Sequence, residues 1–261
     1  MPDPLAYAVL AGSRPGDPYV TWEVVPDQVQ RAWARGGSVV WLAPSAYHGK
    51  LWLTGTGEPA AAAALVSAAL ASADGPRIVG LSLPEASLRH LPGQYLPHRL
   101  ERWSWWWTQT EPAGGIDPAV AALDERDPRL GPLLEQSATV YLRPGDRRAL
   151  GWYGLTVGER LVACLAFERH HPLVPHLASV VVDEPLRGRG FGRRLCGSAV
   201  TTMLREGAPA VSLAMMDANA AARELYRTLG FSAGLSFASG TIPGRRHLPA
   251  EPGWRPGGLP A

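Results

Sequence analysis

The sequence predicts a mixed α/β (α+β) fold, with a mixed central sheet and flanking helices, preceded by a smaller α/β domain. Apolar runs of strand length alternate with runs of helical periodicity along the chain. A loop of alternating glycines and arginines joins one strand run to one helix run. A tryptophan-rich stretch followed by turn residues separates two halves. We therefore expect domains over 1–110 and 117–247, and a loose proline- and glycine-rich tail over 248–261.

The carboxyl-terminal half contains the elements of the main domain. Residues 118–137 are expected to form one or two helices broken at Pro128 and Pro132, because proline interrupts a helix. Beyond the glycine loop, apolar residues recur at i, i+4 spacing from Phe191 to Met203, and Gly207 ends that helix. Strands are predicted over 149–156, 161–168, 177–182, 211–215 and 231–238, and a second helix over 219–229.

The amino-terminal half is also mixed α/β. Strands are predicted over 38–43, 51–54 and 77–83, with an Ala-rich helix over 58–71. The stretch 103–107 contains four tryptophans, which either form a core between domains or line a substrate pocket. The following segment, 111–115, has the turn chemistry of a linker.

Composition excludes several classes of protein. The chain has 261 residues, 46% of them hydrophobic, which is enough for two modest cores or one large one. A net charge of +2, with arginines gathered at one loop, does not favour a nucleic-acid partner. No secretory signal is predicted, and the longest Ala-rich stretch is too short to cross a bilayer, so we expect no membrane partner and a cytoplasmic location. Cys164 and Cys196 are expected in the core rather than in a disulfide.

The loop from Arg187 to Gly192 carries the strongest chemical signal. A helix that starts after such a loop directs free backbone N–H groups at its amino end and attracts an anion, and glycine lets the backbone approach a ligand closely. Arginines occupy positions 187, 189, 193 and 194. A P-loop would need Lys-Ser or Lys-Thr after its last glycine, and a dinucleotide loop would need its third glycine one residue later. The expected ligand is therefore another phosphate-bearing molecule.

Two segments resemble the signatures of one family. Residues 187–192 follow the pattern Arg-x-x-Gly-x-Gly, which resembles the pyrophosphate loop of the Gcn5-related N-acetyltransferases (the GNAT superfamily). Residues 219–231 are similar to the family's second signature, Asn-x-x-Ala-x-x-x-Tyr-x-x-x-Gly-Phe. The amino-terminal half resembles the degenerate acetyltransferase half of two-domain members, the glycine N-acyltransferase-like and FR47-like proteins; an unrelated α/β cap is the alternative.

The resemblance implies that acetyl-coenzyme A is the co-substrate and that Tyr226 lies at its thiol. It implies that backbone N–H groups of the loop bind the diphosphate, with Arg193 or Arg194 near the ribose phosphate, and that Asn219 contacts the pantetheine arm or caps its helix. The residues that the resemblance assigns to the cofactor are Val180, Val181, Val182, Arg187, Gly188, Arg189, Gly190, Phe191, Gly192, Arg193 and Asn219.

The general base stays open among four residues between the third and central strands, namely Glu168, His170, His171 and His176. A histidine with its pKa near 6.5 accepts a proton at neutral pH, which makes His176 a catalytic candidate beside Glu168. Adjacent histidines on a strand face opposite ways, so we expect no metal.

These observations predict an N-acetyltransferase that moves an acetyl or longer acyl group to a primary amine by direct attack in a ternary complex. The amine belongs to a small molecule or to an exposed amino group of a peptide. The alternative is an acyl-coenzyme A binding module without turnover, and a third hypothesis is that the Trp-rich half docks a protein partner. Many members of the family are dimers, so a homodimer stays open.

Overall fold

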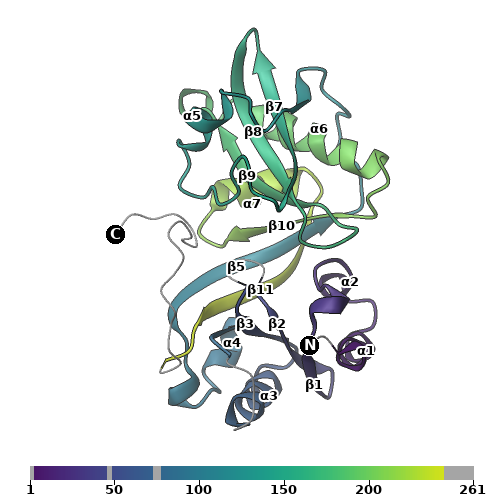
Figure 1. Ribbon diagram of the computed structural model, residues 1–261, viewed down its shortest axis with the longest axis vertical. Coiled ribbons are helices and arrows are strands. Elements are labelled where there is room, and N and C mark those ends of the chain that lie inside the picture. The colour runs from purple at the N-terminus through teal and green to yellow at the C-terminus, as the bar shows by residue number, and fades with distance from the viewer. Residues whose placement is uncertain (1–2, 46–48, 73–77, 244–261) are drawn as a thin grey trace. The chain divides into compact units, whose positions relative to one another are not determined.

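The computed structural model describes residues 3–45, 49–72 and 78–243, which form two compact units. Of the described residues, the first unit contains those up to Ser104 and those from Gly234 to Pro243, and the second contains Trp105–Ala233. Figure 1 labels their helices and strands. The predicted mixed α/β fold, with a central mixed sheet and flanking helices, is confirmed.

The first unit has a mixed sheet in the order β1-β2-β3-β4-β11. Strands β1, β2 and β3 pair antiparallel, β3 and β4 pair parallel, and β11 pairs antiparallel with β4. Its elements are α1 (Pro4–Ser13), α2 (Pro18–Trp22), η1 (Pro26–Gln28), β1 (Arg31–Arg35), β2 (Ser38–Pro44), β3 (Leu51–Thr56), α3 (Pro59–Ala71), β4 (Gly80–Leu83), α4 (Glu85–Leu88), η2 (Gly93–Tyr95) and most of β5 (His98–Thr108) and β11 (Ser232–Thr241).

Three helices of this unit begin with the same capping motif. An acidic side chain accepts hydrogen bonds from backbone N–H groups of the first turn, and a proline follows it at the first helical position. The acidic residues are Asp3, Asp17 and Glu58. One core then packs α3 against the sheet through residues such as Leu42, Leu53 and Val66.

The second unit has the strand order β5-β10-β9-β8-β7-β6. Strands β6 to β9 pair antiparallel, whereas β9 and β10 pair parallel. Its elements are β6 (Val120–Leu123), α5 (Leu130–Leu134), β7 (Ala149–Val157), β8 (Arg160–Glu168), β9 (His176–Val182), η3 (Glu184–Leu186), α6 (Phe191–Arg205), β10 (Val211–Met216) and α7 (Ala220–Thr228).

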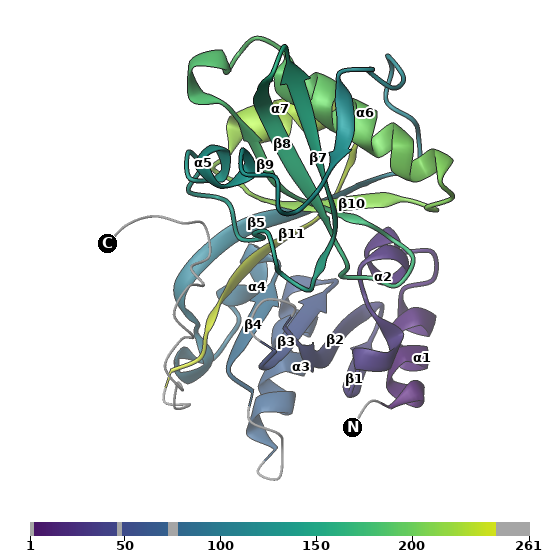
Figure 2. The same ribbon diagram turned by 45° about the horizontal axis from the view of Figure 1, so that its top comes forward.

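Both faces of this second sheet are covered. One core packs α6 and α7 through Leu195, Val200 and Tyr226, and another packs α5 through Leu130 and Leu134. Figure 2 shows α6 and α7 behind strands β7–β9 and α5 in front of them. A sheet buried on both faces explains why β8 is buried from Leu161 to Glu168, and why residues 161–167 form an unbroken apolar run in the sequence.

The helix predicted over residues 118–137 is wrong in its first part. Residues Val120–Leu123 form β6 and pair with β7, and only Leu130–Leu134 form a helix. Strand pairing supplies hydrogen bonds and side-chain contacts that outweigh the helical propensity of Ala121 and Ala122. The side chain of Leu123 also fills the space above Gly154, where a Cβ would lie 2.4 Å from Leu123 Cδ1.

The compact units differ from the predicted domain ranges at two places. The last strand, β11, was expected in the carboxyl-terminal domain, but its residues from Ala238 to Thr241 pair with β4 of the first unit. The division near the middle of the chain lies within β5, between Ser104 and Trp105, rather than after residue 110. The predicted tail over 248–261 lies outside the described residues.

The tryptophans of β5 pack in the cores of both units. Trp103 packs against Phe237 in the first unit, with ring centroids 4.8 Å apart, whereas Trp106 belongs to the core of the second unit. Cys164 and Cys196 are both buried and free, as predicted. Within the described ranges, no helix is both long and apolar enough to cross a membrane.

Candidate functional site

The glycine loop ends in an uncapped helix. Gly190 is the N-cap residue of α6, with a φ of +81°, and no side-chain capping hydrogen bond is present among the described residues. Gly188 also has a positive φ, of +75°. An added Cβ at either glycine would meet no described atom within 4 Å. These glycines therefore serve the left-handed backbone, which exposes the N–H groups of a long helix to an anion.

The arginines around this loop divide into two kinds. Arg187 donates to the carbonyls of Val182 and Gln136, at 3.2 and 2.9 Å, so it braces the loop. Arg194 forms an ion pair with Asp117 at 2.7 Å, which lowers the pKa of that carboxyl group. In the part of the chain that the structure describes, Arg189 and Arg193 are exposed and make no ion pair. These two cations are the ones available to a phosphate.

Beside the loop, β9 has one edge that is only partly paired. Its pairing with β8 continues to Val182, whereas its register with β10 covers His176 and Leu177. The backbone of Val180, Val181 and Val182 lies beyond that register, where an extended ligand can add to the strand. Gly192, on the first turn of α6, faces this strand, since a Cβ there would lie 3.4 Å from a methyl group of Val182.

Helix α7 and its N-cap contain two of the residues that the second signature assigns to the cofactor. Asn219 is its N-cap and accepts a hydrogen bond of 3.0 Å from the backbone N–H of Ala222. Tyr226 is buried on the inner face of the helix, against Phe231 at a centroid distance of 5.6 Å. Burial, with a smaller contribution from Cys196, raises the pKa of Tyr226 well above its usual value. The phenol therefore stays protonated at every physiological pH.

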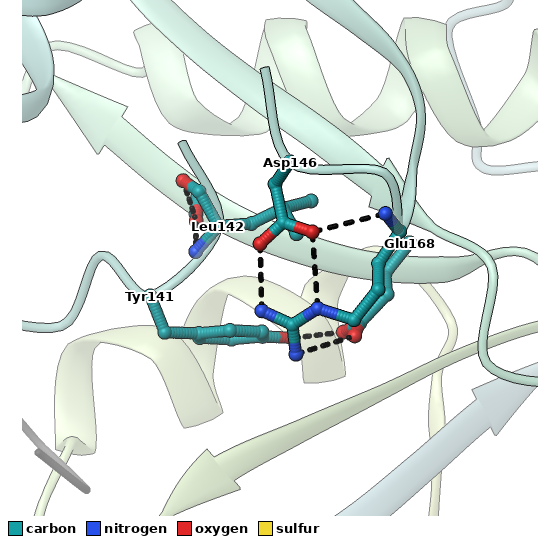
Figure 3. A network of polar contacts seen from close by, with 6 residues as sticks. Tyr141, Leu142, Asp146 and Glu168 are labelled. Carbon is teal, nitrogen blue, oxygen red and sulfur yellow. Dashed lines mark hydrogen bonds and ion pairs between the residues drawn. The ribbon is translucent and has the colours of Figure 1, made fainter. Parts of the chain in front are cut away.

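Glu168 lies in a buried polar network. Its carboxylate accepts a hydrogen bond of 2.7 Å from the Tyr141 hydroxyl and one of 3.2 Å from Arg148. Arg148 also pairs with Asp146 at 2.7 Å, which lowers the pKa of that carboxyl group and raises the pKa of the guanidinium. Figure 3 shows this network, with the hydroxyl end of Tyr141 directed toward Glu168. Both carboxylate oxygens are thus engaged.

His176 is the register partner of Glu168 across β8 and β9. It is buried, and its Nδ1 lies 2.9 Å from the Ser212 hydroxyl on β10. Directly opposed residues share a face of the sheet, so Glu168, His176 and Ser212 form a row of polar side chains across three strands. His170 lies 6.0 Å from His176 between ring centroids, and His171 accepts a hydrogen bond from the Leu173 backbone at 3.2 Å.

Four polar residues of this region were not predicted from the sequence. They are Gln136, Tyr141, Arg148 and Ser212, and each acts through a contact with a residue distant in sequence. Ser179 was not predicted either, because no local sequence pattern indicates that a serine will adopt a positive φ. Among the described residues, no group of three or more His, Cys, Asp or Glu side chains has the arrangement needed to hold a metal ion.

Comparison with known proteins identifies the family. A family model described as "Acetyltransferase (GNAT) family" matches residues 100–231, half of the chain. The chain belongs to the GNAT acetyltransferase family. The GNAT match includes both the glycine loop and the signature of α7, whose positions were read from the sequence. No curated protein matches the chain significantly.

Solved structures agree on the GNAT fold. The chain is similar to a putative GNAT-family acetyltransferase from Novosphingobium aromaticivorans, at 24% identity and a TM-score of 0.51, over 92% of this chain and 97% of that one. It is also similar to a GNAT-family acetyltransferase from Colwellia psychrerythraea, at 14% identity and a TM-score of 0.50, over 78% and 81% of the two chains. At these identities the likeness concerns the fold.

Proposed function

We propose that this GNAT protein transfers an acetyl or longer acyl group from acyl-coenzyme A to a primary amine. The observation that carries the proposal is the juxtaposition of an uncapped helix start with a partly paired strand edge. The N–H groups after Gly190 offer an anion site, and the backbone beyond Leu177 offers hydrogen bonds to an extended amide chain. Coenzyme A matches both features, because its diphosphate is an anion and its pantetheine arm is an extended chain with amide groups.

The anion site fits a diphosphate in shape and in charge. The space that a Cβ would occupy at Gly188 and Gly190 is open, so backbone N–H groups can approach the phosphate oxygens closely. Arg189 and Arg193 are exposed beside them. Arg193 is the better partner for a ribose phosphate, since Arg194 is committed to Asp117. Arg187 would act through the loop's shape, because its guanidinium holds backbone carbonyls.

We propose His176 as the general base. An ammonium group with a pKa near 10.4 costs about 4.6 kcal/mol to deprotonate at pH 7, against about 1.4 kcal/mol for an α-amine with a pKa near 8. A neutral imidazole has one acceptor nitrogen, and the Ser212 hydroxyl, 2.9 Å from Nδ1, orients the ring of His176. Glu168 is less suited, because Tyr141 and Arg148 occupy its oxygens.

Tyr226 would complete the reaction at sulfur. The amine nitrogen forms a bond to the thioester carbon, the carbon–sulfur bond breaks, and Tyr226 donates its proton or a hydrogen bond to the departing thiolate. The raised pKa of the phenol makes it a weaker acid, but the same burial raises the pKa of a thiol bound beside it. The proton affinities of donor and acceptor therefore rise together.

A single assay separates the enzyme from a binding module. Purified protein is incubated with acetyl-coenzyme A and a panel of small amines and peptides, and free thiol is measured. We expect thiol release with at least one amine. Thermal stabilisation by acetyl-coenzyme A without thiol release for any amine would instead favour the acyl-coenzyme A binding module.

Three finer features of the proposal are supported by the sequence alone. They are the likeness to FR47-like and glycine N-acyltransferase-like members, a cytoplasmic location and a homodimer. A screen of metabolite extracts by mass spectrometry, with the protein and labelled acetyl-coenzyme A, would identify the acceptor amine.

A further inference from the structure

Ser179 occupies a strained position in the central strand of the second unit. It is buried and has a φ of +50°, in the left-handed region that favours glycine. A non-glycine residue in that region is strained and persists only where its surroundings hold it. Something in the structure must therefore stabilise this conformation.

The hydroxyl group of Ser179 provides the restraint. It accepts a hydrogen bond from the backbone N–H of Leu142 and donates one to the carbonyl of Leu142, each at 3.0 Å. Leu142 is fully buried, so neither backbone group has water as a substitute partner. We call this pair of bonds the Ser179–Leu142 clamp. Its dashed lines appear beside Leu142 in Figure 3.

The clamp acts at a bulge of β9. Ala178 pairs with Ala166 of β8 and Val181 pairs with Cys164, so Ser179 and Val180 together face Leu165. A bulge leaves the extra residue outside the ladder and re-aims its backbone groups. The bulge begins two residues beyond Leu177, the last residue of β9 in register with β10. Its N–H groups therefore lie at the strand edge proposed to receive the pantetheine arm.

The segment that carries Leu142 also contacts two other parts of the proposed site. Gln136 accepts a hydrogen bond of 2.9 Å from the backbone N–H of Glu184, just before the glycine loop, and its own carbonyl accepts one from Arg187. Tyr141, the neighbour of Leu142, donates a hydrogen bond to Glu168. One segment thus connects the loop, the bulge and the polar row that contains His176.

We propose that Ser179 is a positioning residue for acyl transfer. The Ser179–Leu142 clamp sets the bend of β9 and thereby aims a backbone N–H of the bulge at the thioester carbonyl oxygen, where negative charge develops as the amine attacks. The inference rests on the proposed acyl transfer. It adds that a side chain which touches no reactant controls the rate.

Two substitutions separate the clamp from the backbone strain. Ser179→Ala removes the hydroxyl and keeps the strain, whereas Ser179→Gly removes both. We expect each substitution to lower kcat at least about tenfold. This loss is smaller than the loss caused by removing an oxyanion-hole donor itself, because the backbone N–H is still present. The Kd for coenzyme A should stay within about twofold of wild type. The matched control is Ser198→Ala, which removes another buried hydroxyl that accepts a backbone N–H in the same unit, that of Asp117 at 2.9 Å. It should leave kcat unchanged.

Hydrogen–deuterium exchange of the peptide that spans 177–182 gives a readout independent of turnover. We expect faster exchange in both Ser179 variants and no change in Ser198→Ala. Wild-type kcat in Ser179→Gly, or unchanged exchange in that variant, would overturn the role of the clamp. A wild-type protein that releases no thiol with any amine would instead overturn the proposed function, and the positioning role with it.

Discussion

At the residue scale, two backbone conformations decide how the proposed site is built. Gly190 adopts a left-handed conformation at the start of α6, and Gly207 adopts one after its end, with φ values of +81° and +99°. Neither glycine would bring a Cβ within 4 Å of a described atom. Replacing either residue by alanine therefore introduces backbone strain of about 1–2 kcal/mol without a steric clash.

This pair gives a matched test of the anion site. Gly190→Ala should weaken coenzyme A binding at least about tenfold, because the strained start of α6 turns its N–H groups away from the phosphates. Gly207→Ala should lower the melting temperature to a similar extent and leave binding unchanged. Titration calorimetry and thermal melts measure the two quantities. Equal affinity of both variants would remove the glycine loop from the cofactor site.

Tyr226 is the second residue whose role can be isolated. Tyr226→Phe keeps the buried ring and removes the hydroxyl, so kcat should fall tenfold or more, at the lower edge of typical acid–base effects, while the Kd for coenzyme A stays within about twofold. Tyr153→Phe is the control, because Tyr153 is half-buried in the same unit, with its ring edge against Phe167. Stopped-flow and steady-state kinetics would give the comparison. A Tyr226→Phe enzyme as fast as wild type would make the residue a packing group.

At the scale of elements, capping and turn chemistry determine where the functional helices begin and end. Asn219 starts α7 with a side-chain hydrogen bond to Ala222, and Gly230 ends the helix with a φ of +82°. The cap orients the helix that carries Tyr226. If the side chain of Asn219 acts only as the cap, its loss lowers stability. If the side chain also contacts the cofactor, its loss weakens cofactor binding as well.

Two variants distinguish these roles of Asn219. Asn219→Ala should lower the free energy of unfolding by about 1 kcal/mol, whereas Asn219→Ser, which keeps a capping oxygen, should stay close to wild type. Denaturant unfolding measures the difference. We expect coenzyme A to bind both variants as it binds wild type. Weaker binding by a stable Asn219→Ser variant would show that the amide contacts the pantetheine arm.

At the scale of the whole molecule, the chain returns to its first unit after completing the second. Ala238 and Ile242 enter the core beneath α3, and β11 occupies the edge of β4 opposite to β3. The first unit is thus built from two distant parts of the sequence. Removing the later part would expose a strand edge and leave part of the core unfilled.

A fragment of residues 1–110 should therefore fail to unfold cooperatively. The matched fragment adds residues 232–243 through a flexible linker, which restores the partner of β4, and it should regain a cooperative transition. Circular dichroism during urea titration makes the comparison, with the full chain as reference. Cooperative unfolding of the shorter fragment would mean that residues 1–110 are a domain by themselves.

Local signals in the sequence predicted much of the fold. The i, i+4 apolar spacing and Gly207 predicted α6, and the cap and the closing glycine predicted α7, because these signals lie within a few residues of the structure that they specify. Strand β6 was missed because Val120–Leu123 becomes a strand only through its pairing with β7.

Motifs and periodicity are local, so the residue pattern was enough to predict the family, the glycine loop and the order of most strands and helices in the second unit. Three other features became visible only in the folded chain: β11 pairs with β4, Arg194 pairs with Asp117, and Leu142 holds Ser179 in a left-handed conformation. Each of these depends on a contact between residues far apart in the chain, and no local pattern of residue types encodes such a contact.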